Sequence, residues 1–191
     1  MNIPNKLTIF RVILAPALLA VMLLKFQHNM AVALAIFIVA SITDFLDGQL
    51  ARRNNMVTTF GKFLDPIADK LLVFAAMMGL AARFCVKGIA WVIFIMITRE
   101  LLVASARMLA AADGNVISAD IWGKLKTVAQ MVAVVAVITF EELKTIFELT
   151  KSVTDTFYLV GTILMWITAV LTIFSGINYL MACRRYIMKS K

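Results

Sequence analysis

Long apolar stretches are the feature that most limits what this chain can fold into. An α-helix crosses a hydrocarbon layer about 30 Å thick with about 20 apolar residues, because it rises 1.5 Å per residue. The sequence holds six such stretches: Leu7–Leu24, Met30–Leu50, Phe63–Ala82, Gly88–Ala112, Ile121–Phe140 and Thr156–Ala182. Since 62% of the residues are hydrophobic and only 16% are charged, the composition excludes an ordinary soluble domain. We therefore predict an all-α polytopic membrane protein with six transmembrane helices.

The connections between these stretches are short, so residues 1–191 are predicted to form a single membrane domain. The longest connection, Glu141–Asp155, mixes both charges and is expected to be a loop with at most an interfacial helical turn. Cys85 and Cys183 lack metal-ligand or redox spacing and are expected to be packing residues. His28, in the first loop, is expected to be an ordinary solvated histidine and not a ligand.

Lysine and arginine indicate the orientation, because membrane proteins carry an excess of both in their short cytoplasmic loops. With an even number of spans, both termini share a side with Lys6, Arg52, Arg53, Lys62, Lys124, Lys126, Arg184, Arg185, Lys189 and Lys191. The opposite side holds only Lys25, Arg83, Lys87, Lys144 and Lys151. The richer side is predicted to be cytoplasmic. The net charge of +8 suits contact with anionic lipid, and no pattern indicates nucleic acid.

Four aspartates interrupt the apolar pattern on the predicted cytoplasmic side. Asp44 and Asp47 lie three residues apart at the end of the second stretch, and Asp65 and Asp69 lie four apart at the start of the third. Both spacings place a pair on one face of a helix. Because the connection between the two stretches is short, the helices are expected to be antiparallel neighbours whose aspartates converge.

A single carboxylate at a helix end is commonly just solvated, but four together need compensation. Carboxylates packed closely and partly out of water repel one another, and their pKa values rise unless cations neutralise them. Hard oxygen ligands without a cluster of His or Cys favour Mg²⁺ or Mn²⁺ over Zn²⁺. An ionisable group costs about 2.5–3.5 kcal/mol at the centre of a membrane helix, so the group of four indicates a function.

The residues around the aspartates suit a ligand that carries phosphate. Gly48 lets a ligand approach the backbone closely, and Gly61 offers the same freedom at the start of the next helix. The guanidinium of Arg52 has a bidentate geometry that matches phosphate oxygens. A metal-bound pyrophosphate would fit such a site.

The pattern formed by these residues resembles the signature of the CDP-alcohol phosphatidyltransferases. It reads Asp44-x-x-Asp47-Gly48-x-x-Ala51-Arg52, followed after residues 53–60 by Gly61-x-x-x-Asp65-x-x-x-Asp69. Three further segments, NIPNKLTIFR, ITRELLVASAR and GKLKTVAQM, resemble bacterial members of that family that make phosphatidylglycerol phosphate. The resemblance extends along most of the chain, and the core motif shows no departure from the pattern.

The resemblance implies an enzyme of phospholipid synthesis that transfers the phosphatidyl group of CDP-diacylglycerol to an alcohol and releases CMP. It implies that Asp44, Asp47 and Asp65 hold two divalent cations, Mg²⁺ or Mn²⁺, and that Asp69 binds one of them and acts as the general base. The residues implied to hold CDP-diacylglycerol are Asn5, Thr8, Gly48, Arg52, Thr58 and Gly61. A bacterial inner membrane, an active site on its cytoplasmic side and a homodimer are implied as well.

Basic residues of the fourth and fifth stretches bear on which alcohol attacks. Glu100 and Arg107 lie seven residues apart on one helix face, and Lys124 and Lys126 enter the fifth stretch from the predicted cytoplasmic side. We expect Arg107, Lys124 and Lys126 to bind a phosphate on the acceptor, which favours glycerol 3-phosphate. The two lysines lie on different faces, so only one of them is expected to reach it. The alternative is structural: Arg99 and Arg107 neutralise Glu100 and the aspartates, and the lysines extend to the interface.

Two other functions stay open at this point. Inositol phosphate could replace glycerol phosphate as the acceptor with the same chemistry. An ion-coupled transporter would also carry Asp and Arg inside the membrane, but it predicts acidic residues spread across the membrane depth, whereas these four lie on one side.

Overall fold

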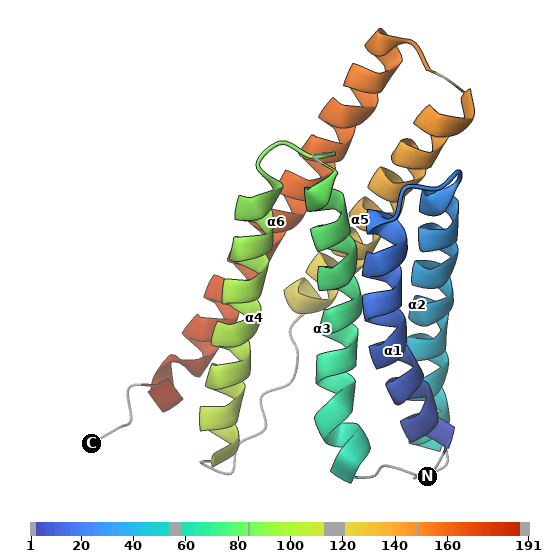
Figure 1. Cartoon of the computed structure of the whole chain (residues 1–191). Coiled ribbons are helices and arrows are strands. Elements are labelled where there is room, and N and C mark those ends of the chain that lie inside the picture. The colour runs from blue at the N-terminus through green and yellow to red at the C-terminus, as the bar shows by residue number, and fades with distance from the viewer. Residues whose placement is uncertain (1–2, 54–58, 84, 113–120, 148, 188–191) are drawn as a thin grey trace. The chain divides into compact units, whose positions relative to one another are not determined.

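The computed structural model describes residues 3–53, 59–83, 85–112, 121–147 and 149–187 (Figure 1). Within these ranges, the side chains of residues 3–6, 44–53, 59–63, 65–66, 69, 112 and 185–187 are not described. The described residues form α1 (Ile3–Leu23), α2 (Asn29–Arg53), α3 (Thr59–Ala82), α4 (Ile89–Ala112), α5 (Ile121–Phe147) and α6 (Lys151–Ile187). These ranges contain no strand, so the predicted all-α fold is confirmed for them.

Three of these helices are long and apolar enough to cross a membrane, judged over the described residues: Ile89–Ala111, Ile121–Phe147 and Lys151–Arg184. The apolar parts of the other three are shorter: Leu7–Leu23, Asn29–Thr43 and Lys70–Ala82. The side chains of residues 3–6, 44–53, 59–63, 65–66 and 69 lie outside the described ones, so these bounds hold only for the described part of each helix. The membrane character is supported, and six crossings stays a prediction.

The prediction of a loop over Glu141–Asp155 is wrong for most of this segment. α5 continues to Phe147 and α6 already begins at Lys151, so most of that segment is helical. The charges that suggested a loop are accommodated on the helix. The ammonium group of Lys144 pairs with the carboxylate of Glu141 one turn earlier, and ion pairs at this spacing support a helix.

The chain divides into two compact units. The first comprises Met1–Cys85 and Val134–Tyr158, and the second comprises Val86–Ala133 and Leu159–Lys191. In the first unit, α1 packs against both α2 and α3. The buried side chains of α1 recur every three or four residues: Thr8, Arg11, Ala15, Leu18 and Met22. This period is that of one helix face, so α1 turns a single stripe toward its neighbours.

The contact of α1 with α3 depends on a residue without a side chain. A Cβ atom at Gly79 would lie 2.5 Å from the sulfur of Met22 and 2.9 Å from its Cβ atom. Real Cβ atoms do not approach so closely, and Met22 is fully buried. Gly79 therefore sets how closely the two helices approach.

The side chain of His28 is 47% exposed, as expected of a solvated histidine, and it also bonds to Glu142 on α5, which the sequence did not predict. Its backbone has a left-handed φ of 61°, and its Nδ1 donates to Glu142 Oε1 over 2.6 Å. The other carboxylate oxygen accepts the backbone N–H of Ala31 at 3.0 Å. Glu142 thus places a negative charge on the first turn of α2, where free N–H groups favour it.

In the second unit, α4 and α6 share a small core in which Val103 and Ala106 meet Tyr179 and Cys183. The turn before α4 is fixed to α6, because the indole Nε1 of Trp166 donates to the carbonyl oxygen of Lys87 at 3.0 Å.

Both cysteines are buried free thiols, as expected of packing residues. Burial is the main cause that raises the pKa of Cys85, which lies in the connection between α3 and α4, to about 12. The thiol is therefore protonated at neutral pH and has little of the thiolate character that nucleophiles and metal ligands need.

Candidate active site

The three helices that carry the aspartate signature and the N-terminal segment come together at one end of the first unit (Figure 1). α1 begins there at Ile3, α2 ends there at Arg53, and α3 begins there at Thr59. α2 runs toward this end and α3 runs away from it, and the two are in contact. The prediction of antiparallel neighbours is confirmed.

The helical rise brings the four aspartates to similar heights. Counted from the helix ends at 1.5 Å per residue, Asp47 and Asp65 lie roughly 9 Å from this end of the unit, and Asp44 and Asp69 roughly 13–15 Å. All four lie in helical backbone, so each pair shares a helix face as predicted. The carboxylate groups themselves lie outside the side chains that the structure describes.

The donor set fits a hard divalent cation. Two pairs of aspartates on neighbouring antiparallel helices supply only oxygen ligands, which suit Mg²⁺ or Mn²⁺. Among the described side chains, which do not include these four, no three metal-ligating groups come together.

Sequence reasoning missed Arg11, which lies in the same layer of helices. Its side chain is only 1% exposed, and so is that of Thr8 three residues earlier. Counted from Ile3, Arg11 lies roughly 12 Å from this end of the unit, at the level of the aspartates. A buried arginine needs compensating negative charge, and an arginine inside an apolar stretch was the signal that could have revealed it.

The residues expected to bind CDP-diacylglycerol share this end of the unit. The first two turns of α1 hold Asn5 and Thr8, the last two turns of α2 hold Gly48 and Arg52, and the first turn of α3 holds Gly61. Thr58 lies outside the described residues. The backbone therefore gathers segments as far apart in the sequence as Asn5 and Gly61, because the helices return to the same end of the unit.

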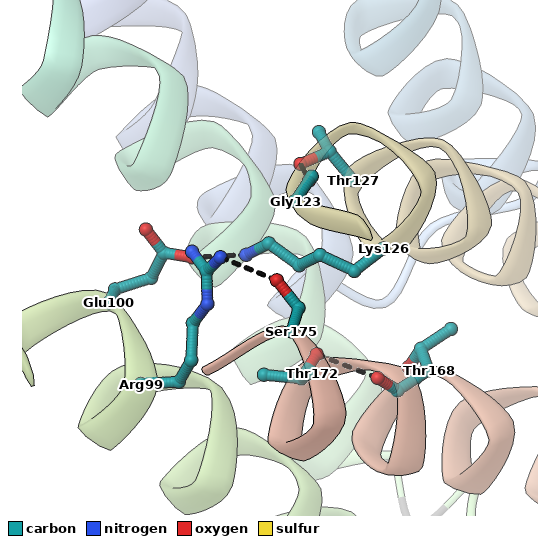
Figure 2. Close-up of polar contacts among 8 residues, drawn as sticks. All are labelled: Arg99, Glu100, Gly123, Lys126, Thr127, Thr168, Thr172 and Ser175. Carbon is teal, nitrogen blue, oxygen red and sulfur yellow. Dashed lines mark hydrogen bonds and ion pairs between the residues drawn. The ribbon is translucent and has the colours of Figure 1, made fainter. Parts of the chain in front are cut away.

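In the second unit, α4, α5 and α6 contribute to a cluster of buried and partly buried polar groups (Figure 2). Arg99 Nη1 donates to Glu100 Oε1 at 3.0 Å, and Nη2 donates to Ser175 Oγ at 2.8 Å. Lys126 Nζ pairs with the same oxygen of Glu100. Side-chain exposure is 11% for Arg99, 15% for Glu100 and 7% for Lys126. Arg99 thus neutralises Glu100, as the structural alternative expected of it.

Two glycines make room for the arginine of this cluster. A Cβ atom at Gly176 would lie 3.0 Å from Arg99 Cγ, and one at Gly123 would lie 3.5 Å from Arg99 Nη2. The aliphatic part of Arg99 therefore lies close against the backbone of α6, and its guanidinium lies next to the backbone of α5. A larger residue at position 176 would have to displace the arginine.

The three residues expected to bind the acceptor phosphate have different surroundings. Lys126 is buried and paired with Glu100, whereas Lys124, two residues earlier, is exposed, so the two lysines do lie on different faces. Arg107 is exposed, and its guanidinium carbon lies 5.9 Å from the centre of the Tyr179 ring. Lys124 and Arg107 therefore lie on the surface of the protein, and Lys126 is held in place by its pair with Glu100.

Comparison with known proteins decides the family. The family model of CDP-alcohol phosphatidyltransferase matches residues 1–174. The chain belongs to the CDP-alcohol phosphatidyltransferase family. The resemblance inferred from the aspartate signature is thereby confirmed.

Individual relatives of this CDP-alcohol phosphatidyltransferase match along nearly the whole chain. A CDP-diacylglycerol–glycerol-3-phosphate 3-phosphatidyltransferase of Bacillus subtilis is 37% identical over 190 residues, which cover 93% of each chain. A protein of the same name from Rickettsia bellii is 36% identical over 185 residues and 97% of each chain. One from Salmonella choleraesuis is 39% identical over 185 residues, 96% of this chain and 95% of its own.

Proposed function

We propose that this phosphatidyltransferase moves the phosphatidyl group of CDP-diacylglycerol to glycerol 3-phosphate and produces phosphatidylglycerol phosphate and CMP. The observation that carries the proposal is the aspartate signature at one end of α2 and α3, in a chain that matches relatives of that name over nearly its full length. The reaction belongs to phospholipid synthesis.

The proposed chemistry is a displacement at phosphorus. The acceptor's hydroxyl oxygen bonds to the phosphorus of the phosphatidyl group, the bond from that phosphorus to the bridging oxygen breaks, and CMP leaves with that oxygen. The hydroxyl proton passes to the carboxylate of Asp69 as general base. Asp44, Asp47, Asp65 and Asp69 would hold two divalent cations, Mg²⁺ or Mn²⁺, which when bound stabilise negative charge on the phosphate oxygens.

CDP-diacylglycerol is proposed to lie against the ends of α1, α2 and α3. Gly48 and Gly61 leave space for its pyrophosphate near the backbone, and Arg52 supplies a bidentate cation. Asn5, Thr8 and Thr58 supply side-chain donors and acceptors for the cytidine and its phosphates. The position of these residues at one end of the unit supports this assignment for all of them except Thr58.

The acceptor phosphate is proposed to bind to Arg107 and to one of the two lysines on different faces of α5, Lys124 or Lys126. Arg107 and Lys124 are exposed cations, and Lys126 is held in place by Glu100. The buried cluster of Arg99, Glu100 and Lys126 carries one more positive than negative charge, which favours a doubly charged phosphate nearby. An alcohol without a phosphate would gain nothing from these charges.

The arrangement in the membrane belongs to the same proposal. We expect six crossings, both termini and the aspartate end on the cytoplasmic side of a bacterial inner membrane, and a homodimer. The support is the apolar pattern, the distribution of lysine and arginine, and the family resemblance.

The identity of the lipid product tests the proposal. Purified protein is given CDP-diacylglycerol with glycerol 3-phosphate, inositol phosphate, serine or glycerol, and the lipid is identified by mass spectrometry. Phosphatidylglycerol phosphate from the first acceptor alone is the expected result. A phosphatidylinositol phosphate would move the acceptor to inositol phosphate, and no lipid product from any acceptor would favour the transporter.

A further inference from the structure

A cavity of about 510 Å³ lies in the first unit, at the end opposite to the aspartates. Its wall is built from the last turn of α1, the connection to α2, the end of α3 and the later part of α5. We name it the distal pocket and define it by Lys25, Phe26, Asn29, Arg83 and Glu141. None of these residues belongs to the proposed active site.

Hydrogen bonds hold the wall of the distal pocket in place. Arg83 Nε donates to the carbonyl oxygen of Met22 at 3.0 Å and so ties the end of α3 to α1. Asn29 Nδ2 donates to the carbonyl oxygens of Val21, at 3.3 Å, and of Leu24. Together with the contacts of Glu142, these bonds fix both sides of the connection between α1 and α2. The pocket is therefore preformed.

The charged groups of the distal pocket favour an anion. Lys25 and Arg83 are both positive, and the bond to Met22 uses only one of the five N–H donors of the arginine. The one carboxylate in the wall, Glu141, is balanced by its pair with Lys144. The neighbouring carboxylate of Glu142 is engaged by His28 and by the backbone N–H of Ala31. Lys25 and Arg83 outnumber this carboxylate and therefore set the sign of the potential inside the pocket.

Apolar side chains of the distal pocket favour a ligand that is more than a phosphate. Met22, Leu23 and Phe26 line it, and the last two are about half exposed, at 52% and 46%. Cations beside exposed apolar groups at a helix end match the boundary between head groups and acyl chains in a bilayer.

We infer that the distal pocket binds an anionic phospholipid, with the head-group phosphate on Lys25 and Arg83 and the first part of an acyl chain along Leu23 and Phe26. A free phosphate would use the cations but leave the apolar wall exposed. A zwitterionic lipid would bring an ammonium group beside the same two cations, which costs binding energy.

A local fluorescent probe tests the inference. The full-length variant Phe26→Trp is placed in phosphatidylcholine nanodiscs that contain increasing fractions of brominated phosphatidylglycerol or, in the other arm, brominated phosphatidylcholine. Quenching is corrected with the parent protein and its own three tryptophans. We expect half-maximal quenching at a lower fraction of the anionic lipid, by about fivefold for each cation that contacts it.

Charge variants on the Phe26→Trp background locate the effect. Lys25→Gln should reduce the preference for the anionic lipid by about fivefold, whereas Lys151→Gln, which removes an exposed charge of the same unit outside the pocket, should not. Arg83→Gln should act like Lys25→Gln but also removes a structural bond, so Lys25→Gln is the deciding variant.

Three results would overturn the inference. Equal quenching by both lipids would mean ordinary contact with surrounding lipid. A preference that Lys25→Gln leaves unchanged would place the anionic lipid elsewhere, and reversal of the quenching by inorganic phosphate would show a small-anion site. The measurement needs neither CDP-diacylglycerol nor glycerol 3-phosphate, so its failure would not bear on the proposed reaction.

Discussion

In the proposed reaction, Asp69 accepts the proton of the acceptor's hydroxyl group. Replacing its carboxylate by an amide tests this role without changing the size of the side chain. Asp69→Asn keeps the size of the side chain but removes the base and one metal-ligating charge. We expect the rate of CMP release to fall by at least about 10²–10⁴-fold, the usual effect of losing a general base. The affinity for CDP-diacylglycerol should suffer less than in Asp47→Asn. A near-normal rate would assign the base to another group.

Replacing Arg107 tests which acceptor the enzyme uses. Arg107→Gln should raise the KM for glycerol 3-phosphate by 10-fold or more if about 1.5–3 kcal/mol of charged hydrogen bonding is lost. The KM for CDP-diacylglycerol should change little. Arg184→Gln, which removes another exposed arginine of the second unit, is the matched control and should leave both values unchanged. If both KM values rise together in Arg107→Gln, the arginine is structural.

Glu100 should matter for stability because it is the acidic member of a buried group with two cations. Glu100→Gln leaves Arg99 and Lys126 without their shared carboxylate, and breaking such a pair costs about 3–5 kcal/mol. Lys126→Met in addition should restore part of the loss, since the two effects are coupled. The free energy of unfolding in detergent measures both. If the two substitutions changed the free energy of unfolding by amounts that simply add, the pairing of Glu100 with Lys126 would be contradicted.

Single residues were predictable where one helix sets their geometry. The spacing of the aspartates sufficed to place each pair on one face, and the different faces of Lys124 and Lys126 follow from their two-residue separation. The partner of Lys126 did not follow, because Glu100 lies 26 residues earlier on another helix. The burial of Arg11 was missed for the same reason, since it depends on how α1 packs against its neighbours.

At the scale of helices, Gly79 is the point where packing is tightest. Gly79→Ala gains about 1 kcal/mol of helix propensity, but its Cβ atom would overlap with Met22, and overpacking costs about 1–3 kcal/mol. We expect a net loss in the free energy of unfolding. In the double variant with Met22→Ala the clash disappears, so the cost of Gly79→Ala should fall or change sign. An equal cost in both backgrounds would show that the clash is not its cause.

Hydropathy predicted that the helices exist, but it placed their ends less well. α6 runs from Lys151 to Ile187, beyond the predicted span 156–182 at both ends, because a helix can continue past its apolar part with charged residues. The cap that Glu142 provides for α2 joins residues 111 positions apart. Such long-range contacts leave no periodic signal in the sequence.

For the whole molecule, the sequence motif and the family match agree on one chemistry, and the fold explains why the motif is split in two. The first pair lies near the end of α2 and the second near the start of the antiparallel helix α3. The two pairs therefore lie at similar distances from the same end of the unit, because the short connection between the helices brings the chain back there. The positions of the carboxylates could not be predicted beyond this, because they depend on side-chain packing and on the cations themselves.

The most direct test of the account is the joint measurement of CMP and lipid product before and after removal of divalent cations. Purified protein receives CDP-diacylglycerol and glycerol 3-phosphate, excess chelator, and then Mg²⁺ or Mn²⁺. We predict that chelation abolishes both products and that either cation restores them in equal amounts, because the four aspartates need the cations to hold the pyrophosphate. Undiminished formation of CMP and phosphatidylglycerol phosphate in excess chelator would contradict the proposed site.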